Sequence, residues 1–292
     1  MKRTSVPRSK VAPMRCLTLT APHSLVLTDR PRPQPAEDEV LLQVSHCALC
    51  RTDAKMWQQG HRDLLLPRVL GHEFCGSAVG TGRRFVVWPG RACGQCDDCL
   101  QGRENLCPSM RILGFHRDGG LAEFVTVPAS ALIPISDDLD PAVACLAEPL
   151  ACSLNGLARV RVQEGERVLI VGGGTLGILL ALGAVSRGAR VCVVDRNPSK
   201  LHRSRILRQG MGIEGAVEVS GPPRFHAAFN AAPGALILPA ALSMLRPGGR
   251  LCLFSGITDP ATLQGSWVNE VHYRELTVSG AYGCTRENMT RA

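Results

Sequence analysis

The stretch Arg167-Val-Leu-Ile-Val-Gly-Gly-Gly-Thr-Leu-Gly177 decides the fold of the second half of the chain. Its first five residues predict a short buried strand, and its glycines predict a tight turn. The apolar run that follows, to about Arg187, predicts a buried helix, and residues 190–195 predict a second strand. Strand, glycine turn, helix and strand form the unit of a parallel sheet covered by helices. We therefore expect an α/β fold with a doubly wound parallel sheet.

The glycine spacing within this stretch predicts a dinucleotide site. Gly172 allows the tight turn, Gly174 lets the backbone approach a pyrophosphate, and Gly177 permits close packing of helix and strand. The helix N-terminus favours the negative charge of the phosphates. Asp195, at the end of the second strand, would bond the adenosine ribose hydroxyls and favour NAD. Arg196 leaves NADP open, because an arginine can accommodate a 2′-phosphate. The predicted cofactor-binding residues in this region are Gly172, Gly174, Leu176, Gly177, Asp195 and Arg196.

The half of the chain before Glu148 differs in character, with short strands and loops in place of strand–helix alternation. We expect strands in both halves wherever short apolar or β-branched runs are bounded by turn residues. In the first half these runs are 17–20, 40–44, 85–88 and 124–127. In the second half they are 250–254, 276–279 and either 227–230 or 235–238, with a turn at Pro247–Gly249.

The strongest chemical signal is the spacing Cys93-x2-Cys96-x2-Cys99-x7-Cys107. Four thiolates at this spacing can wrap one tetrahedral zinc ion, and a site with four protein ligands is structural because no position is left for substrate. An iron–sulfur cluster also uses four thiolates and is the alternative. The chain has 13 cysteines, an odd number, which favours a reducing compartment and metal ligation over disulfides.

A second pair of segments, Cys50-Arg-Thr-Asp53 and Gly71-His-Glu73, predicts a catalytic zinc. Such a zinc has three protein ligands and one open position. Cys50 and His72 would supply two ligands, and the third would be Glu148, or Glu73 when the coordination rearranges. A cysteine and a histidine alone are more often core residues, so this interpretation depends on the cysteine motif and the nucleotide motif beside it.

The overall composition limits the remaining possibilities. The 292 residues carry a net charge of +8, but the basic residues are spread along the chain without interleaved aromatics, so we expect no nucleic-acid partner. No apolar run approaches the roughly 20 residues of a membrane span, so we expect no membrane and a cytoplasmic protein. Residues 1–13 hold four basic and no acidic residues, which is typical of a disordered tail or a short organelle-targeting segment.

These motifs, in this order, resemble the zinc-dependent medium-chain dehydrogenase/reductase family, which includes alcohol, sorbitol and threonine dehydrogenases. The resemblance runs from about Met14 to the C-terminus. It implies a GroES-like zinc-binding catalytic domain over 14–147, after the basic tail 1–13, and a Rossmann NAD-binding domain over 148–292. It also implies hydride transfer between an alcohol or polyol and NAD(P). The segment Glu148–Gly156 is more similar to the polyol branch than to the simple alcohol branch.

The resemblance assigns roles at the predicted catalytic zinc. Cys50 and His72 match its ligands, and Glu73 matches a glutamate behind the metal. Thr52 matches the hydroxyl that relays the substrate proton, and Asp53 matches the carboxylate that orients the histidine.

The resemblance also covers the third ligand and the cofactor. Glu148 lies where the polyol and threonine branches have Glu-Pro. Arg51 matches an arginine that contacts the pyrophosphate, and Lys200 matches a lysine that contacts the adenosine ribose. Asp195 matches the carboxylate that selects NAD.

The chain departs from the family pattern in three places. It ends early relative to the family, the loop Val79–Arg84 is short, and so is the stretch 195–229. The early end favours a second hypothesis, a catalytically weak nucleotide-binding relative or partner subunit. A third is a reductase with a non-alcohol substrate such as an aldehyde. By analogy with the family, a homo-oligomer would pair through the sheet edge near 276–279.

Overall fold

The computed structural model describes residues 12–234, 237–257 and 264–292. The chain divides between Glu148 and Pro149 into two compact units. The predicted basic tail 1–13 lies outside the described residues except for its last two, and Pro13 already begins the first strand.

The first unit is built from two antiparallel sheets, as its short apolar runs predicted. One sheet has the order β2-β1-β4 and the other β10-β6-β5-β3-β9. The second sheet encloses a core that includes Leu42, Phe74 and Val125, which are almost fully buried. The strands are β1 Pro13–Ala21, β2 Ser24–Pro31, β3 Glu39–Ala48, β4 Arg68–Val69, β5 Glu73–Ala78, β6 Arg84–Val87, β9 Phe124–Pro128 and β10 Leu132–Pro134.

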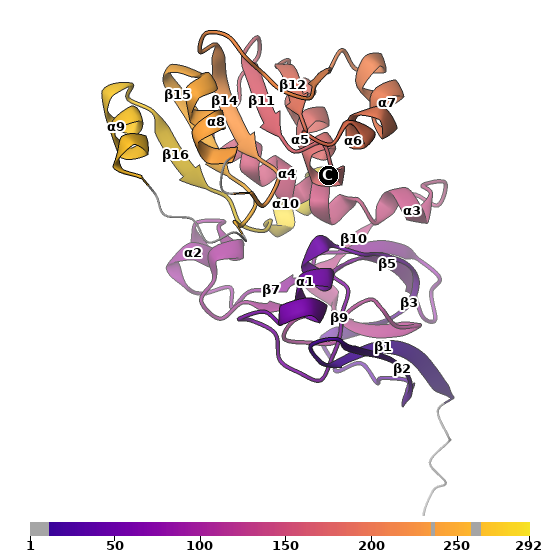
Figure 1. The fold of residues 1–292 in the computed structure, drawn as a ribbon. Helices are drawn as coiled ribbons and strands as arrows, with labels where there is room; N and C mark the ends of the chain where they lie inside the picture. Colours follow the sequence, from indigo (N-terminus) through magenta and orange to yellow (C-terminus); the bar gives the residue numbers. More distant parts are fainter. Residues whose placement is uncertain (1–11, 235–236, 258–263) are drawn as a thin grey trace, which may run out of the picture. The chain divides into compact units, whose positions relative to one another are not determined.

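A lobe is inserted between β6 and β9 of the first unit (Figure 1). It holds the two-stranded sheet of β7 and β8, the short helix α2 and a 3-10 turn η1. Neither α2 nor η1 buries any residue, so the lobe has little apolar core of its own. The remaining elements of the first unit and its lobe are β7 Gly90–Arg91, β8 Arg111–Ile112, α1 Arg51–Gln59, α2 Asp97–Leu100, η1 Glu104–Leu106, η2 Ala129–Ala131 and α3 Pro141–Ala144.

The second unit contains the predicted parallel sheet, whose strand order is β13-β12-β11-β14-β15-β16. Counted from β11, this order is that of a doubly wound dinucleotide-binding sheet, in which ligands bind at the carboxyl ends where the order reverses. That point lies between β11 and β14. The strands are β11 Arg167–Val171, β12 Arg190–Val194, β13 Glu214–Ala216, β14 Phe225–Asn230, β15 Leu245–Leu253 and β16 Thr277–Gly280.

Helices cover both faces of this sheet, which is why the residues of its central strands are mostly apolar (Figure 1). Val168 and Ile170 pack with α4 and α5 on one face, whereas Leu169 packs with α8 on the other. This alternation follows from the two-residue period of a strand. The helices are α4 Ala147–Arg159, α5 Thr175–Val185, α6 Pro198–Arg203, α7 Arg205–Gly210, α8 Ile237–Met244, α9 Gly265–Tyr273 and α10 Arg286–Arg291.

Two local predictions in the second unit have different outcomes. Of the alternatives for one strand, 227–230 is correct, since it lies in β14. Residues 235–236 lie outside the described residues, and 237–238 begin α8, which buries Leu238, Ala241 and Leu242 at helical spacing. The turn predicted at Pro247–Gly249 lies inside β15 as a bulge, where the pairing with β14 skips residues and Gly248 has a φ of +70°.

One helical stretch contradicts the expectation that no apolar run approaches membrane-spanning length. Residues Pro141–Arg159 are long and apolar enough by length and composition alone. Ala151 and Leu157 of this stretch are fully buried, and Leu157 packs in the core of the second unit. We therefore describe it as a core helix.

Candidate functional site

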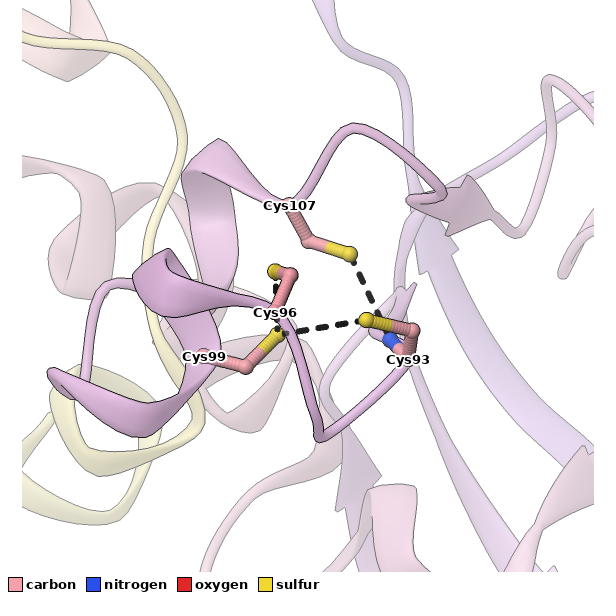
Figure 2. A group of neighbouring side chains, drawn as sticks. All are labelled: Cys93, Cys96, Cys99 and Cys107. Carbon is pink, nitrogen blue, oxygen red and sulfur yellow. Dashed lines mark hydrogen bonds between the residues drawn. The ribbon is translucent and has the colours of Figure 1, made fainter.

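The four cysteines of the predicted zinc motif converge in the inserted lobe (Figure 2). Their sulfur atoms all lie within 4.8 Å of one another. The Sγ of Cys99 is 3.5 Å from that of Cys96 and 3.9 Å from that of Cys93. Gly94 and Gly102 have positive φ values of 75° and 68°, a backbone conformation that glycine adopts without strain. These turns bring the four thiols to one point.

The backbone around Cys93 favours the thiolate form of this side chain, which is the form that binds metals. The backbone amides of Gln95 and Cys96 donate to the sulfur of Cys93 and lower the pKa of that thiol to about 6. The amide of Cys93 in turn donates to the Sγ of Cys107, at 3.3 Å. Four thiolates fit a closed zinc site, and metal binding would supply folding energy that the poorly packed lobe lacks.

A second group forms where Cys50, His72 and Glu73 meet. Each offers a ligand atom within 4.8 Å of the others. Cys50 precedes the first turn of α1, and Glu73 is the first residue of β5. Gly71 has a φ of +96°, and a Cβ there would lie 2.6 Å from the Sγ of Cys47, so only glycine fits before His72. Both His72 and Glu73 are buried.

Asp53 holds this group together. Its Oδ2 accepts a hydrogen bond from the amide of Cys50 at 2.9 Å, and its Oδ1 accepts one from Gly71 at 3.4 Å. The Nδ1 of His72 lies 3.5 Å from the same Oδ1 and has no hydrogen-bond partner among the described residues, although it is buried. The ring of Phe115 packs edge-on against His72 with 5.3 Å between centroids. Asp53 thus faces Nδ1 of His72, so Nε2 is the ring nitrogen that remains available to bind a metal ion.

The charges around His72 suit a bound cation. Burial opposes an imidazolium, but the Asp53 and Cys50 side chains and the charge of Glu148 outweigh it and raise the pKa of His72 well above its usual value. Burial and the Glu148 charge also raise the pKa of Glu73 to about 7. Three carboxyl groups therefore interact electrostatically with a single histidine. A zinc ion would take the place of a proton in this field, so the residues present fit the metal.

Three further residues predicted at this site, Glu148, Thr52 and Arg51, differ in their positions relative to this group. Glu148 lies outside the group formed by Cys50, His72 and Glu73, although its charge acts on His72 and Glu73. Thr52, half-buried, and Arg51, exposed, both lie in the first turn of α1 next to Cys50.

The glycine turn of the second unit leaves no room for side chains at two points. Gly172 has a φ of +126°, and a Cβ there would lie 2.6 Å from the carbonyl oxygen of Ala231. A Cβ on Gly177 would lie 1.8 Å from the carbonyl oxygen of Gly172, so α5 starts directly against the turn. A Cβ on Gly174 would meet no atom within 4 Å, so that position is open. Leu176 is half-buried in the first turn of α5.

Asp195 is fixed from three sides at the end of β12. Its Oδ2 accepts hydrogen bonds from the amide of Gly173 at 2.8 Å and from the Nζ of Lys200 at 2.9 Å. Its Oδ1 accepts one from the amide of Asn197 at 2.9 Å. Burial would raise the pKa of Asp195, but these donors outweigh it and lower the pKa. The residue is therefore an ionised acceptor at neutral pH. Arg196 beside it is exposed.

Sequence reasoning missed two contributors to these sites. Gly173 lies between the motif glycines, and its amide bond to Asp195 follows from the turn geometry, which the spacing of the motif does not encode. Phe115 carries no sequence signal, because its contact with His72 depends on how the loop after β8 folds back. With a dinucleotide-type sheet and a histidine among carboxylates, the chain has the features of a metal-dependent oxidoreductase.

Comparisons with known proteins agree with this class. The family model of the alcohol dehydrogenase GroES-like domain matches residues 36–137. The L-galactonate-5-dehydrogenase of Escherichia coli (strain K12) is 30% identical, over 95% of this chain and 86% of that protein. A zinc-binding dehydrogenase of Sinorhizobium meliloti, solved with NADP, has a TM-score of 0.86 at 28% identity, covering 95% of this chain and 87% of that one.

An Escherichia coli dehydrogenase described as a short chain alcohol dehydrogenase, solved with NADH, has a TM-score of 0.82 at 25% identity. The match covers 94% of this chain and 85% of that one. The chain belongs to the zinc-type medium-chain alcohol dehydrogenase family, as its three motifs predicted. Its first unit has the GroES-like fold and its second the Rossmann fold, and zinc and NAD(P) are the cofactors of its relatives.

The geometry of Asp53 generates a prediction about metal affinity. Asp53→Asn replaces one carboxylate oxygen by an NH2 group, although the backbone amides of Cys50 and Gly71 and the Nδ1 of His72 all face this carboxylate. The Cys50–His72 site should therefore lose affinity for zinc by about 10-fold to 100-fold. Zinc retained after dialysis against chelators of graded strength measures this loss. The matched control is Asp98→Asn in the lobe, whose carboxylate pairs with exposed Arg103 at 2.8 Å. Equal zinc retention in the two variants would contradict the assigned role.

Proposed function

We propose that this chain is a zinc-dependent, NAD-preferring dehydrogenase that oxidises a secondary hydroxyl of a polyol or polyhydroxy acid, with one catalytic and one structural zinc. The observation that carries the proposal is the convergence of Cys50, His72 and Glu73 beside Asp53, separate from the closed site of four cysteines. An open and a closed site in one chain are the pattern of a catalytic and a structural zinc.

The substrate class is supported by the relatives and by the segment at Glu148. Relatives that are 30% and 31% identical are named for the oxidation of L-galactonate and D-altritol, both chains of adjacent hydroxyl groups. Glu148-Pro-Leu150 is similar to the polyol branch, in which a glutamate takes the place of a third cysteine ligand. We propose Glu148 as the third ligand, with Glu73 as the ligand that replaces it when the coordination rearranges.

The residues of the site have distinct tasks in hydride transfer. A bound zinc supplies Lewis-acid polarisation of the alcohol oxygen, and a bound nicotinamide supplies the hydride acceptor. Cys50 and His72 hold lone pairs toward the metal position, and Asp53 fixes the tautomer and direction of His72. The Thr52 hydroxyl accepts the proton that the alcohol releases and passes it toward solvent. We propose that Arg51 contacts the cofactor pyrophosphate.

Removal of Cys50 tests the catalytic assignment. Cys50→Ala deletes a ligand from the open site only, so turnover of a polyol panel should fall by at least about 10³-fold while the melting temperature changes little. Wild type should hold two zinc ions per chain and this variant one, both quantified on the assayed sample by metal analysis.

Cys96→Ala is the matched control for Cys50→Ala, because it removes a thiolate from the closed site. It should lower thermal stability and release the lobe zinc, with activity lost only in proportion to unfolding. Wild-type turnover by Cys50→Ala, or a single zinc in wild type that leaves only on unfolding, would refute the enzyme proposal.

The choice of cofactor depends on Asp195. Its ionised carboxylate would accept from the ribose hydroxyls of NAD and repel the 2′-phosphate of NADP, although the two solved relatives hold NADP and NADH respectively. NADH should therefore bind at least about tenfold more tightly than NADPH, and Asp195→Ser should reduce this ratio. Nicotinamide fluorescence titration measures both constants. Arg205→Ala, at an exposed position of α7, should leave NADH binding unchanged. Tighter binding of NADPH by wild type would exclude the assignment.

We further propose a cytoplasmic homo-oligomer without nucleic-acid or membrane partners. Strand β16 ends the parallel sheet among the described residues, and Val278 on it is 42% exposed. Tyr273, in the neighbouring helix α9, is 78% exposed. Pairing of two β16 edges would cover these apolar groups. Val278→Asp should shift the species seen by light scattering toward monomer, whereas Leu27→Asp, at the 65% exposed Leu27 in the first unit, should not. A wild-type protein that is monomeric in solution would contradict the proposed homo-oligomer.

A further inference from the structure

Asn230 is the last residue of β14 and the one fully buried Asn or Gln side chain in the described part of the chain. Its exposed fraction is 0%. A buried amide is costly unless it is hydrogen-bonded, and this one is well satisfied. Its Oδ1 accepts from the amides of Phe254 at 2.6 Å and Ser255 at 3.3 Å, and its Nδ2 donates to the carbonyl oxygen of Ser255 at 2.8 Å.

These bonds fix the residues that leave β15. The amide of Ser255 also donates to the backbone carbonyl of Asn230 at 2.9 Å, so the exit of β15 is attached to β14 through backbone and side chain. The ring of Phe254 fills the space at Gly156, where a Cβ would lie 2.9 Å from it. The segment is therefore held from two sides.

The same end of β14 contacts the glycine turn. The amide of Ala231 donates to the carbonyl oxygen of Val171 at 2.8 Å, and the carbonyl oxygen of Ala231 limits the space at Gly172. The carboxyl ends of β11, β14 and β15 thus form one hydrogen-bonded rim, which we call the β11–β14–β15 rim. Its residues are Val171–Gly172, Asn230–Ala231 and Phe254–Ser255.

The strand order says which half of a dinucleotide would lie on this rim. Asp195 ends β12, on one side of β11, and would take the adenosine ribose, while the glycine turn after β11 would take the pyrophosphate. The order continues through β14 and β15 on the other side of β11. A dinucleotide that runs along the carboxyl ends therefore places its nicotinamide half over β14 and β15.

We propose that Asn230 is a positioning residue. It fixes the Phe254–Ser255 segment, and this segment contacts the nicotinamide half of the bound cofactor. The proposal rests on the nucleotide site described under the proposed function. The position needs one side chain that accepts from two amides and donates to a carbonyl. The side-chain amide of asparagine both accepts and donates, whereas the carboxylate of aspartate has no proton to donate.

The test compares Asn230→Asp with His226→Ala. Both residues lie in β14, and His226, near its opposite end, accepts a hydrogen bond from the amide of Arg167 at 3.1 Å. Asn230→Asp should weaken NADH binding by about tenfold or more, because a carboxylate faces the Ser255 carbonyl oxygen. It should leave binding of ADP, which probes the adenosine half alone, within about twofold. His226→Ala should lower the melting temperature but leave both affinities unchanged.

A pH titration separates positioning from general destabilisation. A carboxyl introduced into this buried position has a raised pKa and becomes a donor when protonated. NADH affinity of Asn230→Asp should therefore recover toward the wild-type value as the pH falls. Asn230→Ala, which lacks any titrating group, should show no recovery beyond that of wild type.

The outcomes distinguish this inference from the proposed function. A wild-type chain that binds neither NADH nor NADPH refutes the nucleotide site itself. A wild-type chain that binds NADH, with equal losses of NADH and ADP affinity in Asn230→Asp, or with no loss of either, refutes the positioning role. If Asn230→Asp does not fold, Asn230→Ala is measured in its place. A larger loss of NADH affinity than of ADP affinity supports the positioning role, and equal losses or no loss refute it.

Discussion

Helix α5 begins so close to the end of β11 that the chain has no room for a Cβ at Gly177, and the proposed nucleotide site depends on this contact. The turn before α5 must then be made by Gly172 in a left-handed conformation, against the carbonyl oxygen of Ala231. This places the helix N-terminus, with its free amides, at the point where the strand order reverses. The positions of Asp195 and Asn230 at the ends of the adjacent strands follow from the same sheet.

The candidate site around His72 in the first unit is characterised by an excess of negative charge. Asp53, Glu73 and Glu148 interact with one buried histidine. Burial, and then the charges of Glu148 and Asp53, raise the pKa of Glu73 to about 7. Such a cluster is costly without a cation. The inserted lobe differs from this site. Its elements α2 and η1 bury no residue, and four cysteine thiols converge where an apolar core would otherwise lie. In both arrangements a bound metal ion would contribute to the stability of the unit.

Much of this organisation could be predicted from the sequence, because the motifs encode local geometry. The spacing of the four cysteines, and of Gly172, Gly174 and Gly177, constrains atoms that are close along the chain. The roles of Phe115 and Asn230 could not be predicted in this way, because each depends on a residue far away in sequence. The helix at 237–244 was ambiguous for a related reason: a short apolar run has no period that separates a buried strand from a buried helix.

The three internal hydrogen bonds of Asp195 have a consequence for the thermodynamics of cofactor binding. The carboxylate is already oriented by Gly173, Asn197 and Lys200 before any nucleotide arrives. Its rotamer entropy is lost during folding, so association with a ribose does not incur that loss again. Under the proposed function, the adenosine end of the site would be preorganised as a rigid template. Selectivity at this end would then arise from the fit of the nucleotide to a fixed charge, with no adaptation of the protein required.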